Sequence, residues 1–322
     1  MRVLITGMGG ELGTRIAARV QGEPDVDAVL GLDIDPPRRR VDRVEFHRVD
    51  PRNRLRAGEL VRRFAPTHVL HLGIYEPDAR CGPGAAVART ASGSIAALAA
   101  AADGGALEAI VVRSGIEVYG RRRGSPLRPD EDLAPDPTSP FGHSLLHAER
   151  MARMAGDRTG APVTFVRCAP IVGPHFPSPL GRYLRHPIVP FFPLSDAPFS
   201  VLHQSDAADA LVAALTAGVD APVNVVGPGA VTASQAARMG GRVPIPVIGP
   251  AWRLARVTSE ILGAPVPEHV HELLVRGRVA DGSRASALLG VDPAHRTPEV
   301  IEHLFEWADI TWTRPHAGEV AA

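Results

Sequence analysis

The sequence contains no lysine. All 35 of its basic residues are arginine, and 35 acidic residues balance them to a formal net charge of zero. No step of any reaction can therefore depend on a lysine ammonium group, which in other proteins serves as a catalytic base or forms Schiff bases. The neutral balance gives no electrostatic attraction to nucleic acid or to an anionic membrane, so we expect neither as a partner.

Cysteine is also scarce, since only Cys81 and Cys168 occur. Two thiols cannot form a metal cage alone and do not indicate a disulfide framework. His143 and His147 have a spacing that suits metal binding on a helix, but no third ligand is evident, and a solvated helix face explains them better. We therefore expect no metal site.

Long hydrophobic runs are missing as well. No apolar run approaches the ~18 to 20 residues that cross a bilayer, and the first residues have the pattern of a strand rather than of a signal peptide. With 322 residues, of which 45% are hydrophobic, the chain can still bury a large core. These features predict a cytoplasmic protein.

The most informative stretch that is present is the glycine-rich opening, MRVLITGMGGELG. A short aliphatic run is followed by Gly7, Gly10 and Gly13, and a helical pattern starts at Glu11 and Leu12. Glycines at a strand-to-helix turn let backbone N–H groups approach a pyrophosphate, which the helix N-terminus also favours. These five residues are therefore predicted to bind a dinucleotide.

Asp33 ends the second apolar run and strengthens this prediction. An acid in this place can accept hydrogen bonds from the adenosine ribose hydroxyls and repels a 2′-phosphate, which favours NAD over NADP. Three arginines at positions 38–40 lie nearby and weaken that preference. The predicted cofactor is NAD.

Apolar runs that suit strands alternate with helical patterns along the first half of the chain. The runs end near Asp33, Asp50, Gly73 and Ser114. This alternation predicts a Rossmann-type doubly wound parallel sheet of the α/β class, whose ligand lies at the carboxyl ends of the strands. Asp50, Leu72 and Gly73 are therefore added to the predicted cofactor site.

The pattern of the sequence changes after residue 173, where proline-rich loops and short strands such as 197–202 and 222–226 are expected. We predict an NAD-binding domain over residues 1–170 and a smaller C-terminal α/β substrate lobe over 171–322. A helix near 203–217 is expected to pack back onto the first domain. Long helices are expected over 85–102 and 141–158, the second capped by Thr138 or Ser139.

Together these residues resemble the extended short-chain dehydrogenase/reductase superfamily and, within it, the NAD-dependent epimerase/dehydratase family. The resemblance covers nearly the whole chain and is closest to an actinobacterial subgroup similar to UDP-glucose 4-epimerase. It implies NAD as the cofactor and a nucleotide sugar as a possible ligand. The segments that carry it are ITGMGGELG, HLG at 71–73, SGIEVYG at 114–120, SPFGHSLLHAE at 139–149, RCAPIVGP at 167–174 and LHQSDAADA at 202–210.

The positions that carry the family's chemistry are altered. In the family, a tyrosine removes a proton from a sugar hydroxyl while hydride passes to the nicotinamide. A lysine four residues later on the same helix lowers the pKa of the tyrosine, and a serine or threonine orients the hydroxyl. The matching positions here are Phe141, Leu145 and Gly115, and two asparagine positions hold Pro170 and Thr90. The resemblance thus implies an intact cofactor half without the expected proton-transfer groups.

Two interpretations follow, and they leave open whether the protein is an enzyme. In the first, it binds NAD and a nucleotide sugar without the standard epimerisation and acts as a sensor, regulator or assembly partner. In the second, another group substitutes, and Glu117 leads because some dehydratases of the family use an acid beside the tyrosine. The other candidates are Ser114, Tyr119, Tyr183, His143 and His203.

The resemblance also implies residues for the substrate and for self-association. Arg182 falls where contacts to the nucleotide diphosphate would lie, and His203 is assigned to the substrate as well. Enzymes of the family commonly pair their long helices as a four-helix bundle, so a homodimer is expected. Small side chains such as Ala91, Ala97 and Ala99 would permit the close packing of that bundle.

Overall fold

The computed structural model describes residues 1–306 apart from 175, 250 and 262. Its centre is a seven-stranded parallel sheet with the strand order β10-β6-β5-β4-β1-β2-β3. The chain moves outward from β1 in both directions, which is the order of a doubly wound fold, so the predicted fold class is confirmed. The strands are β1 (Arg2–Thr6), β2 (Ala28–Asp33), β3 (Glu45–Arg48), β4 (His68–His71), β5 (Ala109–Gly115), β6 (Val163–Cys168) and β10 (Pro222–Val225).

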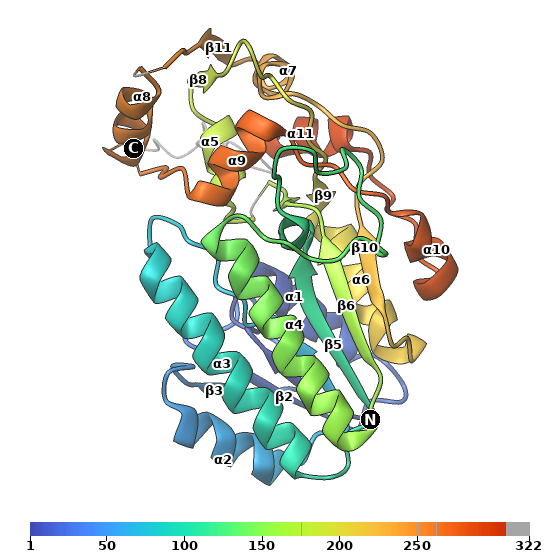
Figure 1. Ribbon diagram of the computed structural model, residues 1–322. Coiled ribbons are helices and arrows are strands. Elements are labelled where there is room, and N and C mark those ends of the chain that lie inside the picture. The colour runs from blue at the N-terminus through green and yellow to red at the C-terminus, as the bar shows by residue number, and fades with distance from the viewer. Residues whose placement is uncertain (175, 250, 262, 307–322) are drawn as a thin grey trace, which may run out of the picture.

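Helices cover both faces of this sheet (Figure 1). On one face α2 (Arg54–Phe64), α3 (Pro83–Asp103) and α4 (Pro140–Thr159) pack side by side. On the other face α1 (Glu11–Val20) packs against α6 (Gln204–Ala217). The central strands are therefore buried from both sides, which explains their continuous runs of aliphatic residues.

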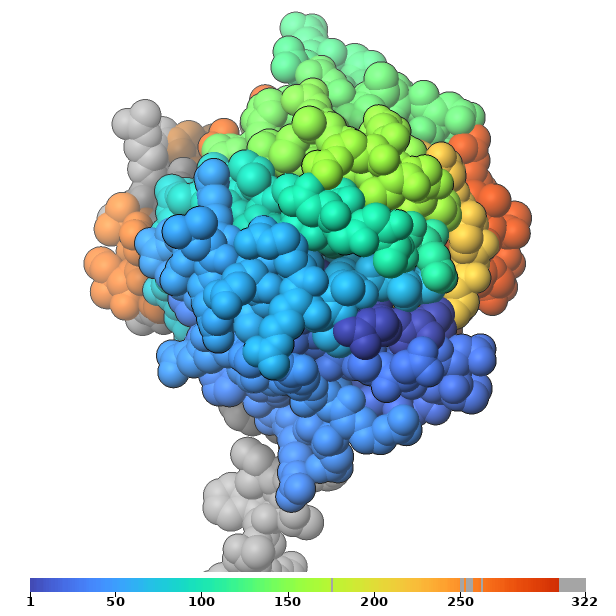
Figure 2. All heavy atoms as spheres, turned by 90° about the horizontal axis from the view of Figure 1, so that it is seen from below, coloured from blue at the N-terminus to red at the C-terminus, as the bar shows by residue number. Residues whose placement is uncertain are grey.

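A smaller lobe with its own hydrophobic core lies at the carboxyl edge of the sheet (Figure 1). From the opposite end of the molecule (Figure 2), most of the visible surface belongs to the first half of the chain, coloured blue to green. The lobe contains α5 (Pro179–Leu184), β8 (Ile188–Phe191), α7 (Ala233–Met239), β11 (Val243–Pro246), α8 (Ala251–Ile261), α9 (Glu268–Arg276) and α11 (Thr297–Phe305). β8 pairs with β11, and β7 (Ile171–Val172) pairs with β9 (Leu202–His203).

Some later segments differ from the expectation. The strand expected over 222–226 belongs to the main sheet, because β10 pairs with β6 from Pro222 opposite Phe165 to Val225 opposite Cys168. α10 (Ser283–Leu289) packs on β10 and α6 in the large core. The strand expected over 197–202 is reduced to β9 and bridges at Phe199. A division of the chain at residue 170 thus assigns β10 to the smaller lobe, whereas it pairs in the main sheet. The sequence of a short strand between loops does not indicate which strand it pairs with.

The start of α4 agrees with its sequence. Ser139 is the N-cap and its hydroxyl accepts a hydrogen bond from the Gly142 N–H, while proline occupies the first turn. Thr138, the other candidate cap, donates its hydroxyl to Glu272 instead. Because the cap fixes where the helix begins, Phe141 lies one turn before residue 145, and both side chains are buried.

α3 is the one helix among the described residues that is long and apolar enough to cross a membrane, with a mean hydropathy of 1.3 over an 18-residue window. This corrects the expectation that no segment reaches that length, which overlooked how apolar a run of alanines is. The same window is 56% buried inside the fold, where α3 packs between α2 and α4. Its composition therefore fits its place in the helix layer.

Candidate functional site

The turn between β1 and α1 is shaped by its glycines. Gly7 has a φ of +71°, and a Cβ there would lie 2.7 Å from the backbone of Leu72. A Cβ on Gly13 would lie 2.3 Å from the Gly7 carbonyl oxygen. Gly10, the N-cap of α1, faces open space, since a Cβ there would meet only that oxygen at 3.8 Å. The first N–H groups of α1 are therefore accessible to an anion.

Gly9 is equally constrained, although the spacing of the other three glycines does not reveal it. Its N–H donates a hydrogen bond to Asp33 Oδ2 at 2.8 Å. A Cβ on Gly9 would lie 1.9 Å from the carbonyl oxygen of Asp35. The glycine turn thus packs directly on the end of β2 and fixes the Asp33 carboxylate beside the start of α1.

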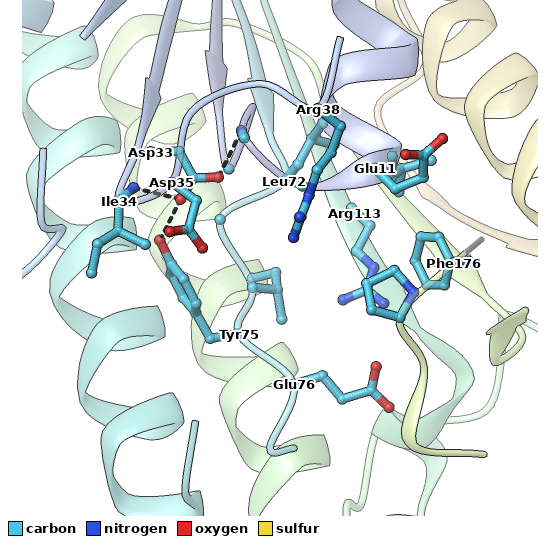
Figure 3. A pocket seen from close by; sticks show the side chains of 18 residues that line it. Glu11, Asp33, Ile34, Asp35, Arg38, Leu72, Tyr75, Glu76, Arg113 and Phe176 are labelled. Carbon is cyan, nitrogen blue, oxygen red and sulfur yellow. Dashed lines mark hydrogen bonds between the residues drawn. The ribbon is translucent and has the colours of Figure 1, made fainter. Parts of the chain in front are cut away.

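Asp33 is only 8% exposed and its carboxylate accepts several hydrogen bonds. The Ile34 N–H donates to Oδ1 at 2.6 Å, and the Tyr75 hydroxyl donates to the same oxygen at 3.1 Å. Figure 3 shows Tyr75 directed at Asp33. Burial raises the pKa of Asp33, and these donors oppose that effect. Because a carboxylate accepts about four hydrogen bonds, Tyr75 occupies a position that a ribose hydroxyl could otherwise take.

These residues line a cavity of about 200 Å³ at the carboxyl edge of the sheet. All the predicted cofactor residues except Asp50 lie on its wall, namely Gly7, Gly10, Glu11, Leu12, Gly13, Asp33, Leu72 and Gly73. The Asp50 carboxylate is bound by Arg52, with one oxygen 2.6 Å from Nη2, and this hydrogen bonding lowers the pKa of Asp50. Asp50 therefore follows β3 as predicted, but its carboxylate is engaged by a neighbour.

Sequence reasoning missed further residues on the cavity wall. Arg113 enters from β5 beside Phe176, and Arg38 and Glu76 also project into the space (Figure 3). Within the described part of the chain, the Arg113 Nε is buried and has no hydrogen-bond partner. It therefore has capacity to bind an anionic or carbonyl group. The available signal was a charged residue that interrupts the apolar run of β5.

Phe141, at the predicted tyrosine position, contacts the smaller lobe. The centroid of its ring lies 4.6 Å from that of His269 in α9. His269 Nε2 lies 2.9 Å from Glu76 Oε1, and Glu76 lines the cavity. A histidine–carboxylate pair thus lies next to the aromatic ring that replaces tyrosine. The two residues are 193 positions apart, so only the fold reveals the pair.

Glu117 fills the space beside Gly115. A Cβ on Gly115 would lie 2.3 Å from Glu117 Oε2 and 3.1 Å from Leu145 Cδ1. A serine at position 115 would therefore force the Glu117 side chain to move. The absence of a side chain at position 115 thus leaves the space that the Glu117 carboxylate fills. Leu145, which replaces the lysine, borders the same space.

Ser114 and Tyr119, the other candidate substitutes, belong to a buried polar network and do not line the cavity. Ser114 Oγ donates to Glu149 at 2.5 Å, and Arg167 donates to both Glu149 oxygens at 3.0 and 2.8 Å. The Tyr119 hydroxyl accepts from Arg167 at 3.0 Å and donates to Asn224 at 2.8 Å. Because burial raises the pKa of Tyr119, its hydroxyl keeps its proton.

The two predicted substrate residues lie apart. Arg182 Nη2 in α5 is 3.8 Å from Asp78 Oδ2, in the loop just beyond Glu76. His203 packs its ring 4.1 Å from that of His295, and burial lowers the pKa of His203 to about 4. Neither residue lies on the cavity wall.

Residues 3–227 match the model of a family described as the NAD dependent epimerase/dehydratase family. An uncharacterized protein of Mycobacterium tuberculosis is 31% identical over 320 residues, covering 96% of this chain and 84% of that protein. UDP-glucose 4-epimerase of Thermotoga maritima, solved with UDP-glucose, has a TM-score of 0.72 at 18% identity and covers 95% of this chain and 98% of its own. UDP-glucuronic acid 4-epimerase of Bacillus cereus, solved with NAD, gives a TM-score of 0.72 at 19% identity with the same coverage.

Proposed function

The chain belongs to the NAD dependent epimerase/dehydratase family, and from this premise we propose that it binds NAD and a nucleotide sugar without the standard hydride-transfer epimerisation. The observation that carries the proposal is the arrangement at the three catalytic positions. Phe141 packs on His269, Leu145 is buried, and the Glu117 carboxylate stands where a side chain at position 115 would begin. None of the side chains at positions 115, 141 and 145 can exchange a proton at neutral pH.

The residues of the glycine turn fit the proposed cofactor. The open space at Gly10 admits a phosphate to the N–H groups at the start of α1, and Asp33 can accept a ribose hydroxyl once Tyr75 releases it. When bound, NAD supplies an acceptor for hydride. The residues of this chain position the cofactor, and the side chains at positions 115, 141 and 145 offer no group that takes the proton that must leave with the hydride.

The hydrogen bond between Tyr75 and Asp33 gives a test of cofactor binding. Tyr75→Phe removes a donor that competes with the ribose, so we expect the Kd for NAD to fall about tenfold or more, since one hydrogen bond to a charged group contributes about 1.5–3 kcal/mol. Asp33→Asn removes the charged acceptor, and the Kd should rise at least about tenfold. Isothermal titration with NAD measures both. A weaker affinity in Tyr75→Phe would mean that the hydroxyl contacts the cofactor instead.

The sugar half of the proposed site combines charge with an apolar wall. The Arg113 guanidinium, whose Nε has no hydrogen-bond partner among the described residues, can bind an oxyanion, and Glu76 on the cavity wall can bind hydroxyl groups. The apolar part of the wall comes from Ile74, Phe176 and Pro177. These groups support recognition of a ligand that carries both hydroxyls and negative charge, as a nucleotide sugar does.

A second candidate function rests on a specific observation. Glu117 is a buried acid beside the replaced positions, and the carboxylate of Glu76 contacts His269, so either group could move a proton in an active epimerase or dehydratase. A regulatory or assembly protein without catalysis is the remaining alternative. Glu117→Gln should abolish whatever turnover is found if this carboxylate carries it, with NAD binding unchanged.

Mass spectrometry of the small molecules released on denaturation tests the proposed function directly. Release of NAD together with a nucleotide sugar is the expected result. Protein that releases nothing and also fails to bind added NAD would refute the proposal. The search should then turn to protein partners.

We also propose a homodimer through the outer surface of α3 and α4. A shallow groove between these helices is lined by Ser94, Ile95, Leu98, Ala99, Ala102, Met151, Met154, Ala155 and Arg158. Met154 is 61% exposed. Ala97, expected in the interface, is buried on the inner side of α3 near Asp33, because it lies on the other face of the helix.

Charge placed in this groove should separate the copies. Ala99→Glu or Met154→Glu would bury like charges against each other across the interface, so sedimentation at micromolar concentration should change from two chains to one. Leu55→Glu, at a side chain 86% exposed on α2, is the matched control and should leave the sedimentation unchanged. Wild-type protein that sediments as a monomer would contradict the proposed homodimer.

A further inference from the structure

Three histidine rings meet outside the cavity. His203 ends β9, His295 precedes α11, and His303 lies in the last turn of α11. One ring nitrogen from each lies within 4.8 Å of the other two. The ring centroids are 4.1, 5.4 and 5.7 Å apart, and all three side chains are half-buried. No other group of three possible ligands occurs among the described residues.

Two of the rings are oriented by hydrogen bonds through Nδ1. His295 Nδ1 lies 3.0 and 3.1 Å from the carboxylate oxygens of Asp206, and His203 Nδ1 lies 2.5 Å from Ser205 Oγ and accepts from the Ser205 N–H at 3.3 Å as the N-cap of α6. Ligation through His203 Nε2 would therefore move the ring proton to Nδ1, which would then donate to Ser205 Oγ. A carboxylate holds the proton on Nδ1 of His295 and leaves the Nε2 lone pair free. This carboxylate–histidine arrangement is the support that metal-binding histidines usually have.

We propose that His203, His295 and His303 bind a single Zn²⁺ ion. Three neutral imidazoles suit Zn²⁺, and a fourth position would remain for water. With Zn–N distances of about 2.0–2.1 Å, tetrahedral ligand atoms lie about 3.4 Å apart, so small rotations of the rings would close the site. The inference is independent of the proposed function, because the ligands lie outside the cofactor cavity.

The surrounding charges are mixed. Asp206 is 3% exposed and contributes the negative charge nearest to His295. Arg15 in α1 is close enough to disfavour a positive charge on His203, but its guanidinium is paired with Glu11 at 3.2 Å. The buried carboxylate therefore compensates part of the charge that a divalent ion would introduce.

The three ligands connect both cores of the molecule. His203 directly precedes α6, which packs in the large core, whereas α11 belongs to the core of the smaller lobe. A metal ion at this point would add a link between elements that already meet through the hydrogen bonds of His295 to Asp206 and of Val201 to Thr297. Its binding should therefore be visible as a gain in thermal stability.

Untagged full-length protein, stripped with chelator and dialysed against ZnCl₂, provides the test. We expect one zinc per chain by elemental mass spectrometry, and a Tm higher by about 5–10 °C at a hundredfold excess of Zn²⁺ over its Kd. His303→Ala should lose both the zinc and the rise in Tm. His143→Ala, at an exposed histidine of α4, is the matched control and should keep both.

Asp206→Asn separates orientation from ligation, because it retains all three imidazoles. We expect its Zn²⁺ affinity to fall about 10- to 100-fold with the stoichiometry unchanged at saturation. Circular dichroism of each stripped variant establishes that it is folded. Wild-type protein that retains no zinc, or a folded His303→Ala that binds zinc as tightly as wild type, would overturn the proposal and leave the cluster as a packing of neutral rings.

Discussion

Purified protein should convert UDP-glucose to UDP-galactose no faster than buffer alone. Proton removal by a positioned group accelerates such a step by about 100- to 10,000-fold, and Phe141 and Leu145 provide neither the base nor the charge that activates it. The absence of lysine from the whole chain means that no neighbouring ammonium group can compensate. Coupled detection of UDP-galactose measures the rate, and turnover on the order of 1 per second would contradict the expectation.

The converse experiment must respect the packing around position 115. Phe141→Tyr with Leu145→Lys and Gly115→Ser restores the family's groups, but the new Cβ would lie 2.3 Å from Glu117 Oε2. We expect measurable epimerisation only when Glu117→Ala is added as a fourth substitution. The triple variant is the matched control, and equal activity in both variants would show that Glu117 does not obstruct the serine.

Arg167→Met should destabilise the protein more than any other single substitution considered above. Arg167 and Glu149 form a bidentate pair in which each side chain is only 4% exposed. Burial alone would lower the pKa of Arg167, but its bonds to Glu149 outweigh burial and raise it. Removing one partner leaves the other charge buried and unpaired, which costs about 3–5 kcal/mol of unfolding free energy. Urea denaturation measures the loss.

Two further variants test whether the loss of stability comes from an unpaired buried charge. Arg158→Met breaks an exposed ion pair with Asp103, in which both side chains are about half exposed, and should cost at most about 1 kcal/mol. Adding Glu149→Gln to Arg167→Met removes the unpaired charge, so stability should partly return. If Arg167→Met were as mild as Arg158→Met, the network around Ser114 and Tyr119 would not be a structural element.

Local patterns in the sequence were enough to predict the parallel sheet, the glycine turn and the position of Asp33 at the end of β2. The resemblance to the family assigned Phe141 and Leu145 to the tyrosine and lysine positions, and helical spacing puts the two on one face. Gly9 escaped notice because its constraint comes from the carbonyl oxygen of Asp35. A local spacing cannot reveal such a contact.

The rest of the site depends on residues distant in the chain. Tyr75 bonds Asp33 across 42 positions, and Tyr119 bonds Asn224 across 105. The hydrogen bond to Asn224 holds Tyr119 in the buried network away from the cavity. The contact with Glu76 places His269 next to the cavity. The sequence showed which chemical groups were present, but their distribution between a binding cavity, a buried network and a histidine cluster is set by tertiary packing.

The path of the chain between its two cores has a consequence for how the molecule unfolds. After α5 and β8 in the smaller lobe, the chain returns to the large core for α6 and β10 and then enters the lobe again. It supplies α10 to the large core and returns to the lobe for α11, the last described helix. A cut at any single position thus leaves at least one core incomplete. We therefore expect the two lobes to unfold together in one transition, and neither to fold as an excised fragment.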